Sequence, residues 1–514
     1  MRLIQSIDYA AIAPPVALGL TAVVVLVADL FLPPARRALA TVISLAGSLV
    51  ALGFAAWLPT QDARHTLCFP GGACSYAADH FTAFFQLLFL GALVVVLLLS
   101  LTSVAEESLP TGEFHFLLLS SVTGMLVLAA SRDLLSLLVA LEVVSLPAFV
   151  LVGLRRGDPR GSEAALKFFL FSVVSTGLTV YGMALVYGVT GTLQVDGIAA
   201  ALAPVHAAGG AKSSLAAAAV VLVVVGFAFK VSAVPFHFWA PDTYQGAPVP
   251  VAAFLSTASK AAGFAGMLVL LLEAFRPYAD VWGPVIAVLA ALTMTVGNLV
   301  ALRQWHIVRL LAWSTVAQAG YMLVPLGIAT TAGGRGAAEL HTAVQATLAY
   351  LGIYVVMNLG AFACVAAVVR HSPRAGVEDF RGLARRSPVL AVCFALFLTA
   401  LAGLPPGVAG LFAKLVILRA AVHGHVAWLA VIAAANAVIG LAYYLRVAAL
   451  LFDLSSDSAA APAVSGPLVA RRSRTVWAAV AVTALGTVAL SVDPQLLLHA
   501  ASTAAASLRH SVAP

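Results

Sequence analysis

Residues 220–264 read VVLVVVGFAFKVSAVPFHFWAPDTYQGAPVPVAAFLSTASKAAGF, and this stretch decides the class of fold. It contains two apolar runs joined by a short polar turn, and each run carries a lysine, Lys230 or Lys260. A lysine near the centre of a membrane helix costs about 3 kcal/mol, so it usually faces the protein interior or a wet cavity. Snorkelling to the membrane surface is the alternative. It fails for Lys260, because about 12 residues on either side, at ~1.5 Å each, place it roughly 18 Å from both ends.

Pro235 adds polar groups at the same depth. A proline inside a helix cannot donate a hydrogen bond to the carbonyl four residues back, which here belongs to Val231. The freed carbonyl, together with Lys230 and His237, predicts a place that holds water inside the membrane. A simple kink is the alternative reading, because proline is common in membrane helices.

The composition places the chain among polytopic membrane proteins. Hydrophobic residues make up 62% and charged residues 10% of its 514 residues, which is far from the balance of soluble proteins. The net charge of +7 does not indicate nucleic-acid binding, because the arginines are scattered through short loops. The four cysteines lack the spacing of a metal or iron–sulfur site. Cys68 and Cys74 share one polar loop and form a disulfide if that loop faces an oxidising side.

Apolar runs long enough to cross a bilayer recur along the chain, which predicts an all-α membrane protein with about 14 transmembrane helices. The runs are 12–32, 38–58, 80–101, 114–131, 134–154, 164–190, 215–239, 247–272, 281–302, 307–328, 342–369, 388–421, 426–452 and 475–492.

Arginine predicts the orientation of these helices. Alternate loops are rich in it, and they hold Arg36, Arg37, Arg155, Arg156, Arg160, Arg303, Arg309, Arg370, Arg374, Arg381, Arg385, Arg386, Arg471, Arg472 and Arg474. The other loops hold mostly single charges, such as Arg64, Arg132, Lys212, Arg276 and Arg335. The rich side should be cytoplasmic, which places both termini outside the inner (cytoplasmic) membrane of the cell.

Lysine is distributed differently from arginine. Four of the five lysines, Lys167, Lys230, Lys260 and Lys414, fall within apolar runs. A buried lysine can exchange a proton near neutral pH, whereas arginine stays charged, so this distribution is typical of a protein that moves protons. Lys167 lies near the start of its helix, after the candidate N-cap Ser162, and is either a site residue or an interfacial anchor.

Glu142 is the only acidic residue near the centre of an apolar run. A buried glutamate must be neutral or paired, and Lys230 and Lys260 are the available partners. Separation of such a pair would favour proton release from the lysine, which is a switch in outline. Pro147 follows in the same run and frees the carbonyl of Val143.

A second interrupted run occurs at 396–421, LFLTALAGLPPGVAGLFAKLVILRAA, where Pro405 and Pro406 precede Lys414. Two broken helices, the seventh and the twelfth, each with one lysine, are expected when two inverted five-helix repeats each build half of a pathway. An interfacial anchor is the alternative for Lys414, because His423 follows about nine residues later, roughly 13 Å along a helix.

The chain supplies no energy source of its own, because it has no P-loop, dinucleotide fingerprint, haem ligands or cluster ligands. Moving one charge against a membrane potential costs about 2.3 kcal/mol per 100 mV. The energy must therefore come from a partner complex or from the gradient of another ion.

These motifs together resemble the antiporter-like membrane subunits of proton-pumping NADH:quinone oxidoreductase, respiratory complex I, and most closely the subunit N type. The resemblance extends to about Phe452. It rests on LEVVSLPAFVL at 141–151, SEAALKFFLFSVVSTGLTVYGMALVYGVTGT at 162–192, the lysine segment at 226–264, GNLVALRQWHIVRLLAWSTVAQAGYML at 297–323, YVVMNLGAFA at 354–363, DFRGLARRSP at 379–388 and GLPPGVAGLFAKL at 403–415.

The resemblance implies 14 helices with two inverted five-helix repeats, with the N-terminal helices in 1–112, the repeats in 113–275 and 276–453, and a cytoplasmic linker and last helix in 454–514. It implies a central polar axis of Glu142, Lys230, Lys260 and Lys414, with Lys167 and His237 as further site residues. Lysine on the twelfth helix argues against subunit M, and an end soon after the fourteenth argues against subunit L. His306, Val308 and Ala413 depart from the usual asparagine, lysine and glycine of these subunits.

The resemblance further implies that the chain carries no cofactor, while partner subunits hold flavin and iron–sulfur clusters. Its partners would be other antiporter-like and small membrane-arm subunits and the lipid bilayer. Two alternatives stay open at this point. One is the related D-type membrane protein of a multi-subunit sodium/proton antiporter, and the other is a non-pumping structural subunit of a membrane arm.

Overall fold

The computed structural model describes residues 7–33, 36–69, 72–107, 109–369, 375–453 and 473–510. Apart from one two-stranded hairpin, these residues form helices and short connections. The principal elements are α1 (Ala13–Phe31), α2 (Ala38–Trp57), β1 (Arg64–Cys68), β2 (Cys74–Ala78), α3 (His80–Glu106), α4 (Thr111–Ala130), α5 (Leu134–Val152), α6 (Pro159–Thr190), α7 (Val195–Ala208), α8 (Gly210–Lys230), α9 (Trp239–Gly246), α10 (Val249–Phe254), α11 (Lys260–Val269), α12 (Ala279–Ala301), α13 (Ile307–Leu323), α14 (Ala337–Val369), α15 (Leu383–Arg386), α16 (Pro388–Ala402), α17 (Val408–His423), α18 (Ala427–Leu451), α19 (Arg474–Val492) and α20 (Gln495–His510).

The apolar runs predicted from the sequence become membrane-length helices. Within the described ranges, 13 helical segments are long and apolar enough to span a bilayer. The predicted run at 388–421 is divided into α16 and α17, so that neither half reaches this length alone. The prediction of an all-α membrane protein with about 14 transmembrane helices is confirmed.

The two predicted interruptions are present. α8 ends at Lys230, and irregular backbone at 231–238 separates it from α9. α16 ends at Ala402, and α17 begins only at Val408. The helix of Lys260 is continuous but irregular, because the π-helical segment η3 (Leu255–Ser259) immediately precedes Lys260. Such π segments occur frequently at functional sites.

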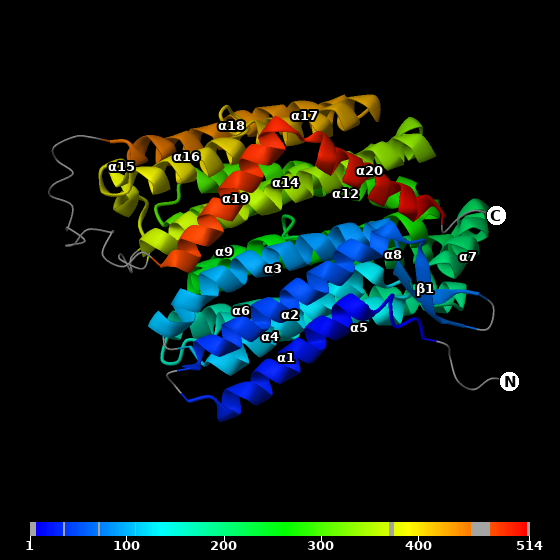
Figure 1. Ribbon diagram of the computed structural model, residues 1–514. Coiled ribbons are helices and arrows are strands. Elements are labelled where there is room, and N and C mark those ends of the chain that lie inside the picture. The colour runs from blue at the N-terminus through cyan, green and yellow to red at the C-terminus, as the bar shows by residue number, and fades with distance from the viewer. Residues whose placement is uncertain are drawn as a thin grey trace.

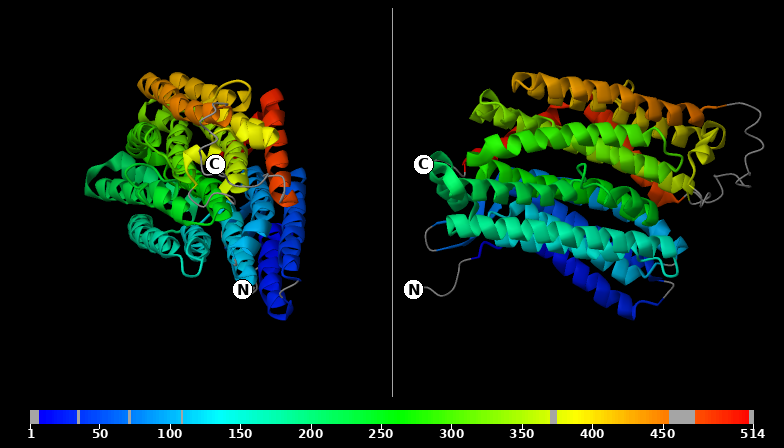
Figure 2. Two further views of the ribbon diagram at one scale, coloured as in Figure 1. Left: turned by 90° about the vertical axis from the view of Figure 1, so that its left-hand side faces the viewer. Right: turned by 180° about the vertical axis from the view of Figure 1, so that it is seen from behind.

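The helices lie side by side in one bundle, with α7 and β1 at one end and α15 at the other (Figure 1). Seen from behind, the helices again lie side by side (Figure 2, right). α3 and α14 contact each other, and α19 and α20 pack against both. The most apolar part of the membrane-length segment at 249–274 is completely buried, whereas only 28% of the corresponding part of α1 is buried. Lys260 therefore lies on the innermost helix of the bundle.

The β1–β2 hairpin holds the predicted disulfide, because Cys68 and Cys74 are paired across the two strands and bonded. The hairpin lies at the α7 end of the bundle (Figure 1). Arg370, Arg374, Arg471, Arg472 and the linker at 454–472 lie outside the described residues.

Gly410 allows α17 to fold closely against the end of α16. A Cβ atom on Gly410 would overlap the carbonyl oxygen of Ala400. We expect Gly410→Ala to cost about 1–3 kcal/mol through overpacking and to reduce the amount of assembled protein. Gly177→Ala on α6 is the matched control, because a Cβ atom added there would meet no other atom within 4 Å. Equal amounts of both variants in membranes would contradict this explanation.

Candidate functional site

Lys230 is buried, with 5% of its surface exposed, at the last residue of α8. Its ammonium donates a hydrogen bond to the Ser145 hydroxyl on α5 at 2.8 Å. Ser145 lies three residues after Glu142, so both side chains lie on neighbouring positions of one helix face. Lys230 thus reaches the helix of Glu142 about one turn away from the carboxylate.

Glu142 is half-buried and accepts a hydrogen bond from the Thr176 hydroxyl on α6 at 2.9 Å. Glu142 lies near enough to influence Lys230 electrostatically. The direct ion pair that was expected from the sequence is absent from the described residues, for Lys260 as well as for Lys230. The reason is geometric, because Ser145 takes the ammonium and partial exposure relieves the carboxylate of the need for a charged partner.

Lys260 is the most enclosed of the lysines, with 1% of its surface exposed. Its ammonium donates to the backbone carbonyl of Thr315 on α13 at 2.9 Å. A carbonyl oxygen is a neutral acceptor, so this hydrogen bond stabilises the charged form far less than a carboxylate would.

Lys414 is buried as well, with 7% of its surface exposed. Its ammonium donates to the carbonyl of Ala402 at 2.5 Å and lies 5.4 Å from the centre of the Tyr321 ring. The carbonyl is available because Pro406, four residues later, has no N–H to donate to it. The side chain therefore points to the break in the helix and not outward to His423, which disfavours the anchor reading.

His237 lies in the irregular segment between α8 and α9. It is 5% exposed, its ring centre lies 5.2 Å from that of Trp313, and its Nδ1 has no hydrogen-bond partner among the described residues. Lys260 is near enough to influence it electrostatically. His237 and Lys260 are thus brought near each other beside the predicted interruption.

Lys167 lies apart from the other three lysines of the apolar runs. Its side chain is 42% exposed and forms ion pairs with Glu163 at 2.7 Å and Asp242 at 3.2 Å. Asp242 also binds Arg309 at 2.6 Å. Burial raises the pKa of the Asp242 carboxyl, but hydrogen bonds from Arg309 and Lys167 outweigh it and hold the pKa below its usual value. Lys167 belongs to an ionised cluster near the start of α6 and not to the group of buried lysines.

Comparisons with known proteins identify the family of the chain. The sequence profile of the family described as NADH:quinone oxidoreductase/Mrp antiporter, TM, matches residues 131–440. NADH-quinone oxidoreductase subunit N 2 of Streptomyces griseus is 49% identical over 513 residues, covering 97% of this chain and 94% of the relative. Subunit N of Salinispora tropica is 46% identical over 454 residues, covering 88% and 87%.

The chain belongs to the NADH-quinone oxidoreductase subunit N family. It is a proton-translocating, antiporter-like membrane subunit of respiratory complex I, and other subunits of that complex are its partners. Among solved structures, respiratory complex I from Thermus thermophilus with bound aureothin contains a chain with 31% identity and a TM-score of 0.73, covering 95% of this chain and 99% of that one.

The fold by itself does not distinguish subunit N from the antiporter alternative. A chain of the Mrp complex from Dietzia has a TM-score of 0.80 at 20% identity, covering 97% of this chain and 98% of that one. That likeness shows a shared fold only. The sequence identity to subunit N proteins is what separates the two families.

In this subunit N chain, a buried polar network on α13, α14 and α18 was not predicted from the sequence. The Gln318 amide donates to the Leu401 carbonyl at 3.2 Å and to the Tyr444 hydroxyl at 3.1 Å, and Tyr350 donates to Gln318 at 2.5 Å. Tyr354 donates to the Thr315 hydroxyl at 3.1 Å. The sequence signal was the polar spacing of Ser314, Thr315, Gln318 and Tyr321 on one face of α13.

A buried charged cluster near the α7 end was not predicted either. Arg132 binds Asp79 at 2.7 Å and approaches Glu273 to 3.7 Å. Glu273 is 1% exposed and lies in the π-helical segment η4 (Leu270–Ala274), which ends the helix of Lys260. The sequence did not indicate Glu273 as a buried residue, because it follows the last residue of the apolar run at 247–272.

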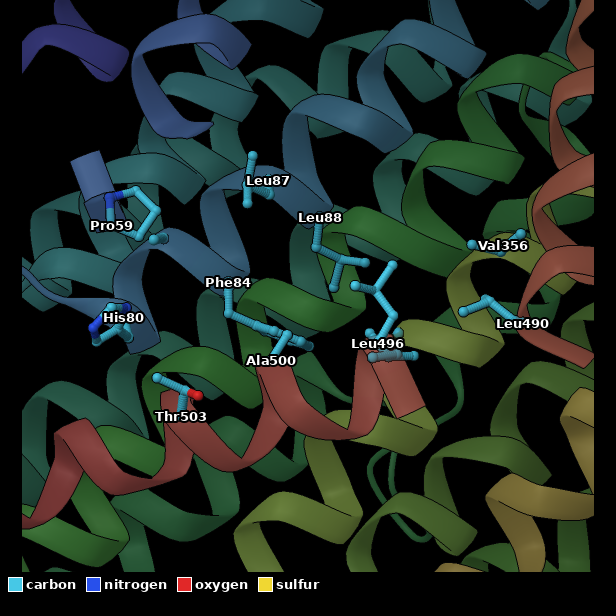
Figure 3. Close-up of a pocket in the computed structure, with 13 residues that line it drawn as sticks. Pro59, His80, Phe84, Leu87, Leu88, Val356, Leu490, Leu496, Ala500 and Thr503 are labelled. Carbon is cyan, nitrogen blue, oxygen red and sulfur yellow. The ribbon is translucent and has the colours of Figure 1, made fainter. Parts of the chain in front are cut away.

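An apolar cavity of about 500 Å³ lies among α3, α14, α19 and α20. Figure 3 shows Phe84, Leu88, Val356 and Leu496 among its lining side chains. None of the six predicted site residues lines it. The apolar lining of this cavity suits a hydrocarbon chain and not the passage of protons.

Proposed function

We propose that protons cross this subunit through Glu142, Lys230, Lys260 and Lys414, with His237 beside Lys260. One observation carries the proposal: Lys230, Lys260 and Lys414 are all buried, and each ammonium donates to a neutral oxygen. A buried ammonium without a carboxylate at contact distance is costly, so its loss of a proton becomes comparatively easy.

The polar network supplies the connection between Lys260 and Lys414. Lys260 binds Thr315, and Gln318 lies one turn further along the same face of α13. Gln318 then binds the Leu401 carbonyl, whose neighbour Ala402 binds Lys414. Groups that both donate and accept, such as the amide of Gln318 and the hydroxyl of Tyr444, can reorganise as the charge on either lysine changes.

In this proposal Glu142 and Lys230 act as a switch. In one of its two states the Lys230 ammonium is hydrogen-bonded to Ser145 and separated from Glu142. Movement of the ammonium by one turn along α5 would bring it to Glu142 and stabilise its charge. Return to Ser145 removes that stabilisation and favours proton release. Because Glu142 is half-buried, its carboxylate keeps partial contact with solvent while the lysine is on Ser145.

A double-mutant cycle tests this pair. Glu142→Gln or Lys230→Ala should each lower pumping about tenfold, because each leaves the remaining charge without its switching partner, and the double mutant should lose less than the sum. The measurement is proton uptake by inverted membrane vesicles, normalised to assembled complex. Thr176→Val is the control, because it removes a hydrogen bond to Glu142 but leaves both charges. Strictly additive losses would contradict the coupling.

The orientation that we propose places the arginine-rich end in the cytoplasm and both termini outside. Arg155, Arg160 and Arg309 line one cavity at this end, and the disulfide hairpin lies at the opposite end, as an oxidising outer side would favour. Lys167 belongs to the cytoplasmic mouth of the pathway in this view. The two repeats comprise 113–275 and 276–453.

The partners that we propose are antiporter-like and small membrane-arm subunits, with flavin and iron–sulfur clusters held in redox subunits elsewhere in the complex. Purification of the tagged chain followed by mass spectrometry tests this assignment. We expect flavin and iron–sulfur subunits to co-purify. Recovery of small membrane proteins alone would contradict it and favour an antiporter assembly.

A further inference from the structure

Two polar cavities lie at the arginine-rich end of the bundle. One has a volume of about 480 Å³ and is lined by residues that include Asp158, Glu163, Lys167 and Asp242. The other has a volume of about 360 Å³ and includes Glu106 and Glu107. The two cavities share three lining residues, Arg155, Gln245 and His306. We treat the two cavities as one vestibule that meets at these residues.

The carboxylates of the vestibule are already engaged. Glu163 binds Lys167 at 2.7 Å, Glu107 binds Arg155 at 2.5 Å, and Asp158 approaches Arg155 to 3.7 Å. Asp242 binds two cations, as described above, and Glu106 also has an interaction partner. Glu107, Asp158, Glu163 and Asp242 are therefore committed to ion pairs with neighbouring cations.

His306 differs from these groups. The residue lines both cavities, and its buried Nδ1 has no hydrogen-bond partner among the described residues. Burial lowers the pKa of His306, Arg309 and Arg160 lower it further, and Asp379 opposes them. The ring is therefore mainly neutral at neutral pH and can accept a proton transiently.

Backbone pairing fixes the position of the His306 backbone. His306 pairs with Gly376 in an isolated bridge, and Ile307 donates to the Ala375 carbonyl at 2.9 Å. The backbone of His306 is therefore held beside the segment that contains Ala375 and Gly376.

α13 connects His306 to the buried lysines. The helix begins at the next residue, Ile307, and carries Trp313 against the His237 ring and Thr315 against Lys260. Trp313 lies seven positions after His306, which corresponds to about 10 Å along the helix. A file of a few water molecules would span that distance.

We propose that His306 is the group through which protons are taken from cytoplasmic water toward His237 and Lys260. The His306 imidazole accepts a proton from a hydronium ion in the vestibule, which leaves water, and then releases a proton to a water on the inner side. Only N–H and O–H bonds form and break, and no oxidant or reductant is needed. This inference rests on the proposed function and on its orientation.

The test uses the complete complex in inverted membrane vesicles, whose outer surface is the cytoplasmic face. We expect His306→Ala to assemble normally and to lower pumping about fivefold near pH 8, but less than about twofold near pH 6.5. Without the imidazole, uptake depends on free hydronium, which becomes scarce as the pH rises. Added imidazole should enter the open vestibule and restore pumping near pH 8.

Two further variants separate a proton carrier from a structural residue. His306→Asn and His306→Gln retain hydrogen bonding but cannot take up a proton, so both should show the same pH-dependent loss. His423→Asn is the matched control, because His423 is exposed at the end of α17 and should pump normally at both pH values.

A loss that is equal at both pH values and insensitive to imidazole would overturn the proposal, as would unchanged pumping. Failure of all three His306 variants to assemble would show a structural role and overturn it as well. The outcome is distinguishable from failure of the lysine pathway. Normal pumping by Lys260→Arg would contradict the proposed lysine pathway. Normal pumping by His306→Ala, together with defective pumping by Lys260→Arg, would contradict only the proposed role of His306.

Discussion

Lys260→Arg should yield an assembled complex whose proton pumping falls about tenfold or more. Arginine keeps the positive charge on a side chain of similar length, but its guanidinium stays protonated near neutral pH. A group that cannot release its proton cannot act as an acid–base relay, and such relays contribute on the order of a hundredfold or more to rate. The effect should be large because Lys260 is 1% exposed, so bulk water does not replace it.

Lys212→Arg provides the matched control for this substitution. Lys212 is an exposed residue near the start of α8, where only charge and solubility matter, and its arginine variant should pump like the parent. The measurement is the pH change driven by NADH in inverted vesicles, normalised to the amount of assembled complex. Near-normal pumping by assembled Lys260→Arg would show that charge is needed there and not titration.

Lys414→Ala should also assemble and lose most of its pumping, again about tenfold. The substitution removes the cation that lies between the Ala402 carbonyl and the face of the Tyr321 ring. Lys414→Glu should be worse, because it places a negative charge against a carbonyl oxygen and the electron-rich ring face. The measurement is again vesicle pumping per assembled complex.

Lys414→Gln separates this role from a structural one. Glutamine can still donate a hydrogen bond to the Ala402 carbonyl, but its side chain cannot release or take up a proton. Arg419→Gln is the matched control on the same helix, because Arg419 is exposed and should be silent. A Lys414→Gln variant that pumps like the parent would make Lys414 a helix anchor and remove the second half of the proposed pathway.

The interruptions of the two helices could be predicted because their causes are local. Pro235 follows Lys230 by five residues, and the pair Pro405–Pro406 cannot continue α16. The depth of Lys260 could be predicted for a similar reason, since the length of an apolar run sets the distance to the membrane surface. Long runs of apolar residues also indicated the all-α class, because a helix satisfies its own backbone hydrogen bonds within lipid.

The elements that could not be predicted from the sequence are short or only partly apolar. α7 and α20 lie outside the runs that were assigned to the membrane. α20 packs against α3 and α14, so its burial depends on helices that are distant in the chain. Their periodicity alone gave too weak a signal against the membrane-length runs around them.

By itself, then, the sequence determined that this chain crosses a membrane many times, that two of its helices break beside a lysine, and that lysine is kept for the interior. Only the tertiary structure decided what each ammonium touches: Ser145 and not Glu142 for Lys230, a carbonyl of α13 for Lys260, and the end of α16 for Lys414. It also separated Lys167 from the buried group. The reason is physical, because burial and helix breaks follow from local composition, whereas a hydrogen-bond partner depends on how helices distant in sequence are rotated against one another.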